Sequence, residues 1–171
     1  IRDRFGIGGG GAEITCNEVT IPTPPTYMDP ITRTMNLYGA TYVTDGPGEV
    51  TTQGTINWYS PTTVITTYIK ANQTGNMSLY LTYIPTGRCN EIEITCEGKT
   101  FSVTLPCPNT TSEKTIPIGI IPVTKTGYMK IEMRGKNLSE GGVNGYARVR
   151  SFGFGGMTNL TYGQSSPNTP N

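Results

Sequence analysis

The sequence predicts an all-β protein, a jelly-roll-type β-sandwich preceded by an extended N-terminal arm. Three observations lead to this fold class. Threonine, tyrosine and isoleucine are frequent and leucine is scarce, a composition that favours strands. No stretch shows helical periodicity long enough to indicate a helix. Short alternating segments are separated by clusters of glycine, proline and asparagine, as is typical of a sandwich.

Clusters of these turn-forming residues, together with changes in composition, divide the chain into four segments. Residues 1–19 are the arm, which includes a glycine run at 8–11. Residues 20–34 are a Thr/Pro-rich linker that we expect to be extended and fairly stiff. Residues 35–157 are the sandwich domain, and residues 158–171 are a tail that ends in Ser, Pro and Asn. A length of 171 residues suits one domain with tails.

Seven strands are expected within the domain, and several of them alternate apolar and polar residues. The expected ranges are 36–44, 63–70, 78–84, 91–96, 100–105, 127–134 and 146–154. Alternation predicts three sets of inward-facing residues, because successive side chains on a strand point to opposite faces. These sets are Met77, Leu79, Leu81 and Tyr83; Phe101, Val103 and Leu105; and Met129, Ile131 and Met133.

The arm repeats two short pieces of the domain. Residues 2–9 (RDRFGIGG) reappear with one inserted residue at 148–156 (RVRSFGFGG), and residues 13–16 (EITC) recur at 93–96. Both copies in the domain lie in expected strands, so the arm is expected to be strand material that must hydrogen-bond to a partner. The residues that would make this pairing are Phe5, Gly6, Ile7, Gly8 and Ile14. The arm either closes its own domain or completes the sheet of a neighbouring molecule.

The chain contains four cysteines, an even number, and their spacing does not match that of metal ligands. We therefore expect two disulfides. The strands around residues 97–99 form a hairpin, and a three-residue loop centred on Gly98 would place Cys89 opposite Cys107. This predicts the pairs Cys89–Cys107 and Cys16–Cys96. The alternative is Cys96–Cys107 together with Cys16–Cys89.

Several features predict a secreted, extracellular glycoprotein. The first residue is Ile1, so we expect that a leader has been removed. Paired cysteines suit an oxidising compartment. Five sequons predict covalent N-glycans, at Asn72, Asn76, Asn109, Asn137 and Asn159.

Composition argues against several functional classes. A net charge of +1 is too small to indicate nucleic-acid binding. No apolar run reaches the roughly 20 residues needed to span a bilayer. The chain contains no histidine, which removes the commonest general base and metal ligand. The carboxylates are scattered, so a paired-carboxylate hydrolase is only a third hypothesis. We therefore expect no enzyme activity, no metal and no cofactor.

The domain resembles a family of secreted β-sandwich domains of unknown function that are similar to carbohydrate-binding modules. The resemblance covers about residues 36–156. It rests on the order and spacing of short motifs: Gly39-Ala40-Thr41-Tyr42-Val43-Thr44, Asn57-Trp58, Thr63-Val64-Ile65-Thr66-Thr67-Tyr68, Gly98-Lys99-Thr100-Phe101-Ser102-Val103 and Gly127-Tyr128-Met129-Lys130-Ile131. The resemblance implies a sandwich fold and brings no catalytic residues. It does not extend to the arm, the linker or the cysteine pairs.

Two functions fit these observations. The leading hypothesis is a structural subunit that assembles with copies of itself into an extracellular filament, by donating its arm as a strand. The alternative is a monomeric carbohydrate-binding or accessory module whose arm folds back. Trp58 and Tyr80 are the candidates for stacking on a sugar ring, although a sole tryptophan in a small sandwich is more often a core residue.

Overall fold

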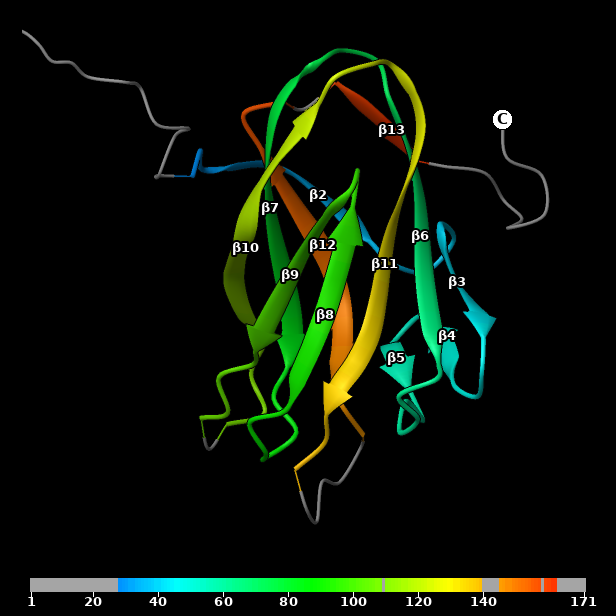
Figure 1. Cartoon of the computed structure of the whole chain (residues 1–171). Helices are drawn as coiled ribbons and strands as arrows, with labels where there is room; N and C mark the ends of the chain where they lie inside the picture. Colours follow the sequence, from blue (N-terminus) through cyan, green and yellow to red (C-terminus); the bar gives the residue numbers. More distant parts are fainter. Residues whose placement is uncertain (1–27, 109, 140–144, 158, 163–171) are drawn as a thin grey trace, which may run out of the picture.

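The structure is a computed structural model that describes residues 28–108, 110–139, 145–157 and 159–162. All regular secondary structure in these residues is β-strand, arranged as two antiparallel sheets and a short ribbon (Figure 1). This confirms the predicted jelly-roll-type sandwich. Nothing is described of the arm, so Phe5, Gly6, Ile7, Gly8, Ile14 and Cys16 all lie outside the described residues.

A four-stranded sheet forms one layer. Its order is β10 (Lys114–Val123), β7 (Gly75–Ile84), β12 (Arg148–Gly155) and β2 (Ile31–Asn36). Every neighbouring pair is antiparallel. The β12 strand is the domain copy of the sequence RDRFGIGG, and it already has a partner on each side.

A six-stranded sheet forms the second layer, in front of β7, β12 and β2 in Figure 1. Its strands are β13 (Leu160–Tyr162), β6 (Val64–Ala71), β11 (Gly127–Asn137), β8 (Glu91–Cys96) and β9 (Lys99–Thr104), with β3 (Thr41–Asp45) also on β6. β3 pairs with residues 64–67 of β6 and β13 with residues 69–71, so the two short strands share one long strand. The separate ribbon consists of β4 (Glu49–Thr51) and β5 (Gly54–Ile56).

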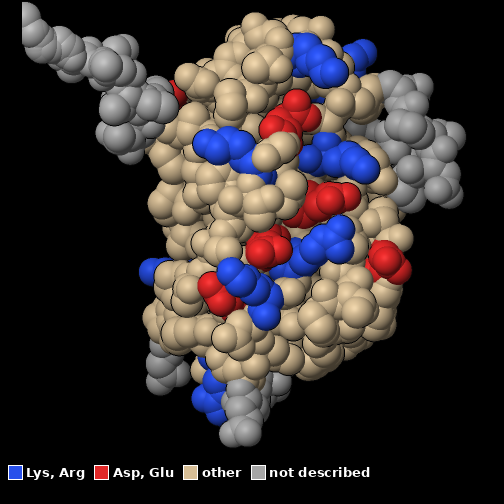
Figure 2. Space-filling view, viewed as in Figure 1, with Lys and Arg blue, Asp and Glu red and all other residues tan. Residues whose placement is uncertain are grey.

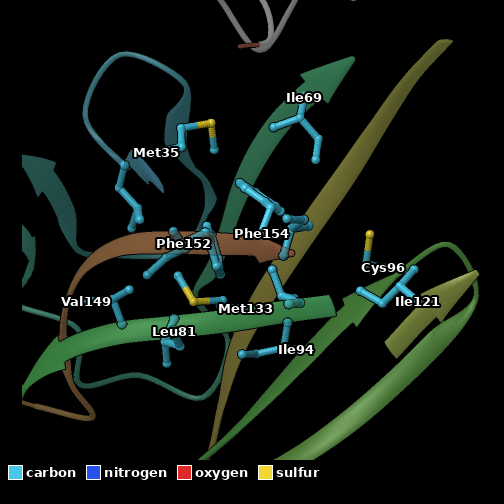
Figure 3. Packing of buried hydrophobic residues seen from close by; sticks show 14 of the residues in the cluster. Met35, Ile69, Leu81, Ile94, Cys96, Ile121, Met133, Val149, Phe152 and Phe154 are labelled. Carbon is cyan, nitrogen blue, oxygen red and sulfur yellow. The ribbon is translucent and has the colours of Figure 1, made fainter. Parts of the chain in front are cut away.

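The core lies between the two sheets and follows the predicted alternation. Figure 3 shows Leu81, Phe152 and Phe154 of the four-stranded sheet pointing towards Met133 and Ile94 of the six-stranded sheet. The inward sets predicted on β7 and β11 are all buried: Met77, Leu79, Leu81, Tyr83, Met129, Ile131 and Met133. Leu105 is buried as predicted, whereas Phe101 and Val103 are only half-buried because β9 is an edge strand.

The sequence prediction misplaced several elements. The expected strand 36–44 is two strands, because Ala40 N–H donates to Leu37 O (3.1 Å) and closes a turn at residues 37–40. β10 was not predicted, since Pro117 and Pro122 interrupt its pattern; it forms at a sheet edge, where proline is tolerated. β2 starts at Ile31, within the segment expected to be the linker, and β13 ends at Tyr162, within the segment expected to be the tail.

The predicted hairpin register is wrong by one residue, although the predicted disulfide is present. Cys96 pairs with Lys99, so the loop between β8 and β9 holds two residues, Glu97 and Gly98. Both have positive φ (49° and 79°), as a type I′ turn requires. Cys89 is bonded to Cys107 with 4.9 Å between their Cα atoms. The bond is therefore diagonal and lies beyond the end of the strand ladder.

Candidate functional site

The two aromatic residues proposed for sugar stacking are not open platforms. Trp58 is a core residue with no exposed surface and packs against Tyr146 at 5.4 Å between ring centroids. The favoured interpretation of a sole tryptophan as a core residue is therefore confirmed, and Trp58 is not available to stack on a sugar. Tyr80 is half-buried, and its hydroxyl donates to the carbonyl of Asp29 (2.5 Å). The chain at residues 29–31 packs over this part of the four-stranded sheet, close to Gly153 and Gly155.

Sequence reasoning missed a third aromatic residue, Tyr38. It lies in the turn between β2 and β3, and 60% of it is exposed. The residues around Tyr38 anchor the turn to the domain. Leu37 is fully buried and donates its N–H to Arg150 O (3.1 Å), and Ala40 is also buried. Gly39 follows with φ of +100°, a conformation that few other residues adopt without strain. An exposed ring on an anchored turn is suited to contact with a ligand.

Tyr38 borders a depression of about 350 Å³ on the outer face of the four-stranded sheet, which we call the Tyr38 depression. Four places in the fold contribute its polar lining. These are Thr34 and Asn36 from β2, Arg150 and Ser151 from β12, Thr51 and Thr52 at the tip of the β4–β5 ribbon, and Glu113 just before β10. Hydroxyl, amide, guanidinium and carboxylate groups thus meet one aromatic ring.

The β4–β5 ribbon is fastened to β12 by a buried threonine. Thr55 Oγ1 donates to Ala147 O (2.9 Å) and accepts from Val149 N–H (2.9 Å). Gly54 allows this contact, because a Cβ built on it would lie 2.3 Å from Val149 O. At the tip, Thr51 Oγ1 donates to Gly54 O (3.3 Å) and accepts from Gln53 N–H (3.0 Å). The ribbon therefore presents Thr51 and Thr52 in a defined position.

The charges in the depression compensate each other. Arg150 Nη1 lies 3.3 Å from Glu113 Oε2, with 30% and 50% of the two side chains exposed. The pair leaves one cationic and one anionic group side by side, so the depression has no strong net charge. Such a pair provides both donors and acceptors to a neutral polar ligand.

The outer face of the six-stranded sheet has a different character. Figure 2 shows basic and acidic side chains interleaved over this face. Glu132 lies between Lys130 (3.8 Å) and Arg134 (3.9 Å), and Glu91 lies 3.9 Å from Lys136. These carboxylates are members of a solvated charge ladder, which is the common structural role of such residues. Among the described residues, no group of three or more potential metal ligands is close enough to hold an ion.

Cys96 is the described cysteine outside the Cys89–Cys107 bond. Its side chain is buried in the core, and burial, with a smaller contribution from the Glu97 carboxylate, raises the pKa of its thiol to about 12. The predicted partner Cys16 lies outside the described residues, so the Cys16–Cys96 bond stays a prediction. No helix in the described part of the chain is suited to crossing a membrane.

Four of the five sequon asparagines are described, and all four are exposed: Asn72, Asn76, Asn137 and Asn159. Asn109 lies outside the described residues. Asn72 Nδ2 donates to Thr161 Oγ1 (2.7 Å), which ties the β6–β7 turn to β13. Exposure is what an acceptor site needs, and glycosylation itself stays a prediction.

The fold is similar to that of solved carbohydrate-binding modules. A family 35 carbohydrate-binding module from an environmental isolate is similar with a TM-score of 0.51 and 12% identity, over 71% of this chain and 96% of that one. A CBM35 from Cellvibrio japonicus Abf62 gives 0.50 and 16%, over 77% and 99%. A GH26-CBM35 β-(1,4)-mannanase from Podospora anserina gives 0.53 and 16%, over 80% of this chain and 28% of the enzyme. At these identities the likeness concerns the fold alone.

The comparison by sequence gives the family. No curated protein matches the chain. A family model described as "Domain of unknown function (DUF5077)" matches residues 35–158, which is most of the chain and nearly all of the described sandwich. The chain therefore belongs to the DUF5077 family of domains of unknown function.

Proposed function

We propose that this domain is a non-catalytic, extracellular module that binds carbohydrate in the Tyr38 depression. The observation that carries the proposal is the combination of one exposed ring on a rigid turn with a polar lining of hydroxyl and amide groups. Sugars present an apolar face of C–H groups and an edge of hydroxyls. An aromatic ring suits the first and polar side chains that both donate and accept suit the second.

The electrostatics of the depression support a neutral ligand. The Arg150–Glu113 pair supplies hydrogen-bonding groups of both kinds without a net charge, so it does not favour anions or cations strongly. The hydroxyls of Thr52 and Ser151 add groups that can turn to donate or accept. Uncharged sugar hydroxyls are the ligand chemistry that matches this set best.

Two further features support the wider proposal. The fold is that of carbohydrate-binding modules in the solved structures above, and the chain contains no histidine to act as a general base. The Cys89–Cys107 disulfide suits an oxidising, extracellular compartment. We also propose that the exposed sequons carry glycans. Asn76 lies six residues from Thr82 on β7, about 20 Å along the strand, and Thr82 is opposite Ser151 of the Tyr38 depression, so the attachment point of a glycan at Asn76 is remote from the depression.

The proposal is tested by replacing the aromatic ring. Purified full chain is titrated calorimetrically with soluble xylan, mannan and galactan, which are three neutral polysaccharides. We expect at least one to bind, and we expect Tyr38→Ala to weaken that binding by about tenfold or more, equivalent to about 1.4 kcal/mol.

Tyr128→Ala is the matched control, because Tyr128 is also exposed (36%) but lies on the six-stranded sheet. Thermal unfolding of both variants should match the unmodified protein, since neither ring is buried. If the protein binds a polysaccharide and the two variants bind it equally well, the Tyr38 depression is not the site. If none of the three binds, the proposed function fails for neutral polysaccharides.

A further inference from the structure

A second depression lies on the same face of the four-stranded sheet, next to the first. It has a volume of about 270 Å³ and is lined by Ile84, Pro85, Thr86, Thr111 and Arg148. Arg148 belongs to β12, as does Arg150 of the Tyr38 depression. Strand β12 therefore contributes one arginine to each of two neighbouring hollows.

A bulge in β12 produces this arrangement. Val149 pairs with Tyr83 and Ser151 pairs with Thr82, so Arg150 is the extra residue in the register between β12 and β7. Val149 is fully buried in the core, whereas Arg148 and Arg150 are half-exposed. Bulges of this kind redirect side chains and are common at binding sites. Here the bulge lies at the junction of the two depressions.

A row of short polar side chains crosses the sheet beside this junction. The ladder registers place Thr115 opposite Thr82, Thr82 opposite Ser151, and Ser151 opposite Asn36. The exposed hydroxyls of Thr82 and Thr115 lie 2.8 Å apart. Ser151 and Asn36 line the Tyr38 depression, and Arg148, opposite Ile84, lines the other. All four side chains of this row are short and polar.

The row is longer than a single sugar ring. Neighbouring strands lie about 4.8 Å apart, so four strands span about 14 Å across the sheet. Hydroxyl, amide and guanidinium groups recur along this distance, which suits the repeated hydroxyls of successive sugars in a chain. Tyr38 lies near the β2 end of this row, and Ile84 and Pro85 of the second depression lie beside its middle, just past Thr82 on β7.

We infer that the ligand is a linear oligosaccharide that lies across β12 and occupies both depressions, with Arg148 as a specificity-determining residue of the second. This inference rests on the proposed function and names the form of the carbohydrate. The Tyr38 depression holds one sugar, and the Arg148 depression holds a sugar further along the same chain. Affinity then depends on chain length, because a short ligand reaches only one hollow.

The test measures affinity against chain length. The full chain is titrated with manno- and xylooligosaccharides of one to six sugars, together with Arg148→Ala and the control Arg134→Ala on the six-stranded sheet. We expect affinity to rise with length until both depressions are filled. Arg148→Ala should weaken the longest ligand by about tenfold, as expected for loss of a hydrogen bond from a charged donor, and leave the shortest that binds unchanged. Arg134→Ala should have no effect at any length.

The outcomes separate this inference from the function on which it rests. If the shortest binding ligand already has full affinity, or if Arg148→Ala has no effect at any length, the second depression is not a subsite and the ligand is a single sugar or chain end. Equal weakening at all lengths also overturns the inference, because Arg148 would then contact the first sugar. If no oligosaccharide or polysaccharide binds the unmodified protein, the proposed function itself fails. Thermal unfolding of each variant excludes loss of folding as the cause.

Discussion

Burial raises the pKa of three tyrosine hydroxyls in this domain. Tyr83 is 1% exposed, and its hydroxyl donates to the carbonyl of Pro106, which connects β7 to the segment that carries Cys107. Burial raises the pKa of Tyr83 to about 12. Burial also raises the pKa of Tyr68 and of Tyr146. Burial therefore disfavours the charged form of each of these groups.

Replacing Tyr83 by phenylalanine should alter stability in two ways. At neutral pH the variant loses one buried hydrogen bond, which costs about 1 kcal/mol. At alkaline pH the native protein loses stability as pH rises from about 10, where the unfolded tyrosine ionises, to about 12, where the folded one does. Tyr83→Phe lacks this transition, so its free energy of unfolding should fall less steeply over that window. Urea unfolding at a series of pH values measures both effects.

Tyr128→Phe is the control for this experiment, because Tyr128 is exposed on the six-stranded sheet, outside the core. Parallel alkaline profiles for Tyr83→Phe and the unmodified protein would contradict the assignment of the raised pKa to Tyr83.

At the scale of single residues, alternation predicts burial well and predicts ligand contacts poorly. It placed Met77, Leu79 and Leu81 in the core because a strand has only two faces. Tyr38 was missed, because its exposure depends on a turn at Gly39 that interrupts a segment read as one strand. The signal was present as an aromatic residue followed by glycine. Only the fold, however, brings Tyr38 beside Arg150, more than a hundred residues away in the chain.

The β8–β9 hairpin shows how a correct pairing can follow from an incorrect register. Counting outward from a three-residue loop placed Cys89 opposite Cys107, whereas the two-residue turn at Glu97-Gly98 shifts every pair by one. The disulfide still forms because both cysteines lie past the last ladder pair, Glu91 with Thr104, where the chain is less constrained. Spacing therefore indicated proximity, and turn chemistry decided the register.

Removing this disulfide should weaken the domain without changing its fold. The bond joins residues 18 apart, and closing a loop of that size contributes about 3 kcal/mol in the chain-entropy account. We expect the double variant Cys89→Ala, Cys107→Ala to unfold at lower urea concentration with an unchanged β-rich circular dichroism spectrum. Hydrogen exchange should show the β8–β9 amides still protected, because Asn90 also anchors the hairpin base. The side chain of Asn90 donates to the carbonyls of Gly145 and Tyr146 (3.0 Å each) and accepts from Ser139 N–H (2.8 Å).

The comparison variant is Gly98→Ala, which keeps the disulfide and strains the turn, since Gly98 has a φ of +79°. Its expected cost is about 1 kcal/mol. A double cysteine variant as stable as the unmodified protein, or one with exchange-labile β8–β9 amides, would show that the bond has a different role.

At the scale of the whole molecule, the described strands complete both sheets without the arm. The repeated sequence is the basis of the hypothesis that the arm acts as a strand. In β12, Phe152 and Phe154 point into the core, while Gly153 and Gly155 lie close to residues 29–31 on the other face. The arm sequence Phe5-Gly6-Ile7-Gly8 has the same alternation. However, β12 already pairs with β7 and β2, so an added strand must extend a sheet edge rather than take the place of β12.

Self-assembly through the arm therefore stays a hypothesis with a direct test. Deleting residues 1–19 should leave a folded body, because the sandwich is built from strands that begin at Ile31. We expect the truncated protein to sediment as a monomer and the full chain to form larger species. Cys16→Ser in the full chain separates strand exchange from covalent linkage: if assembly needs only the strand, this variant still assembles but comes apart in denaturant without reductant. A full chain that sediments as a monomer, together with a truncated protein that does not fold, would mean that the arm closes its own domain. The protein would then act as a single carbohydrate-binding module rather than as a filament subunit.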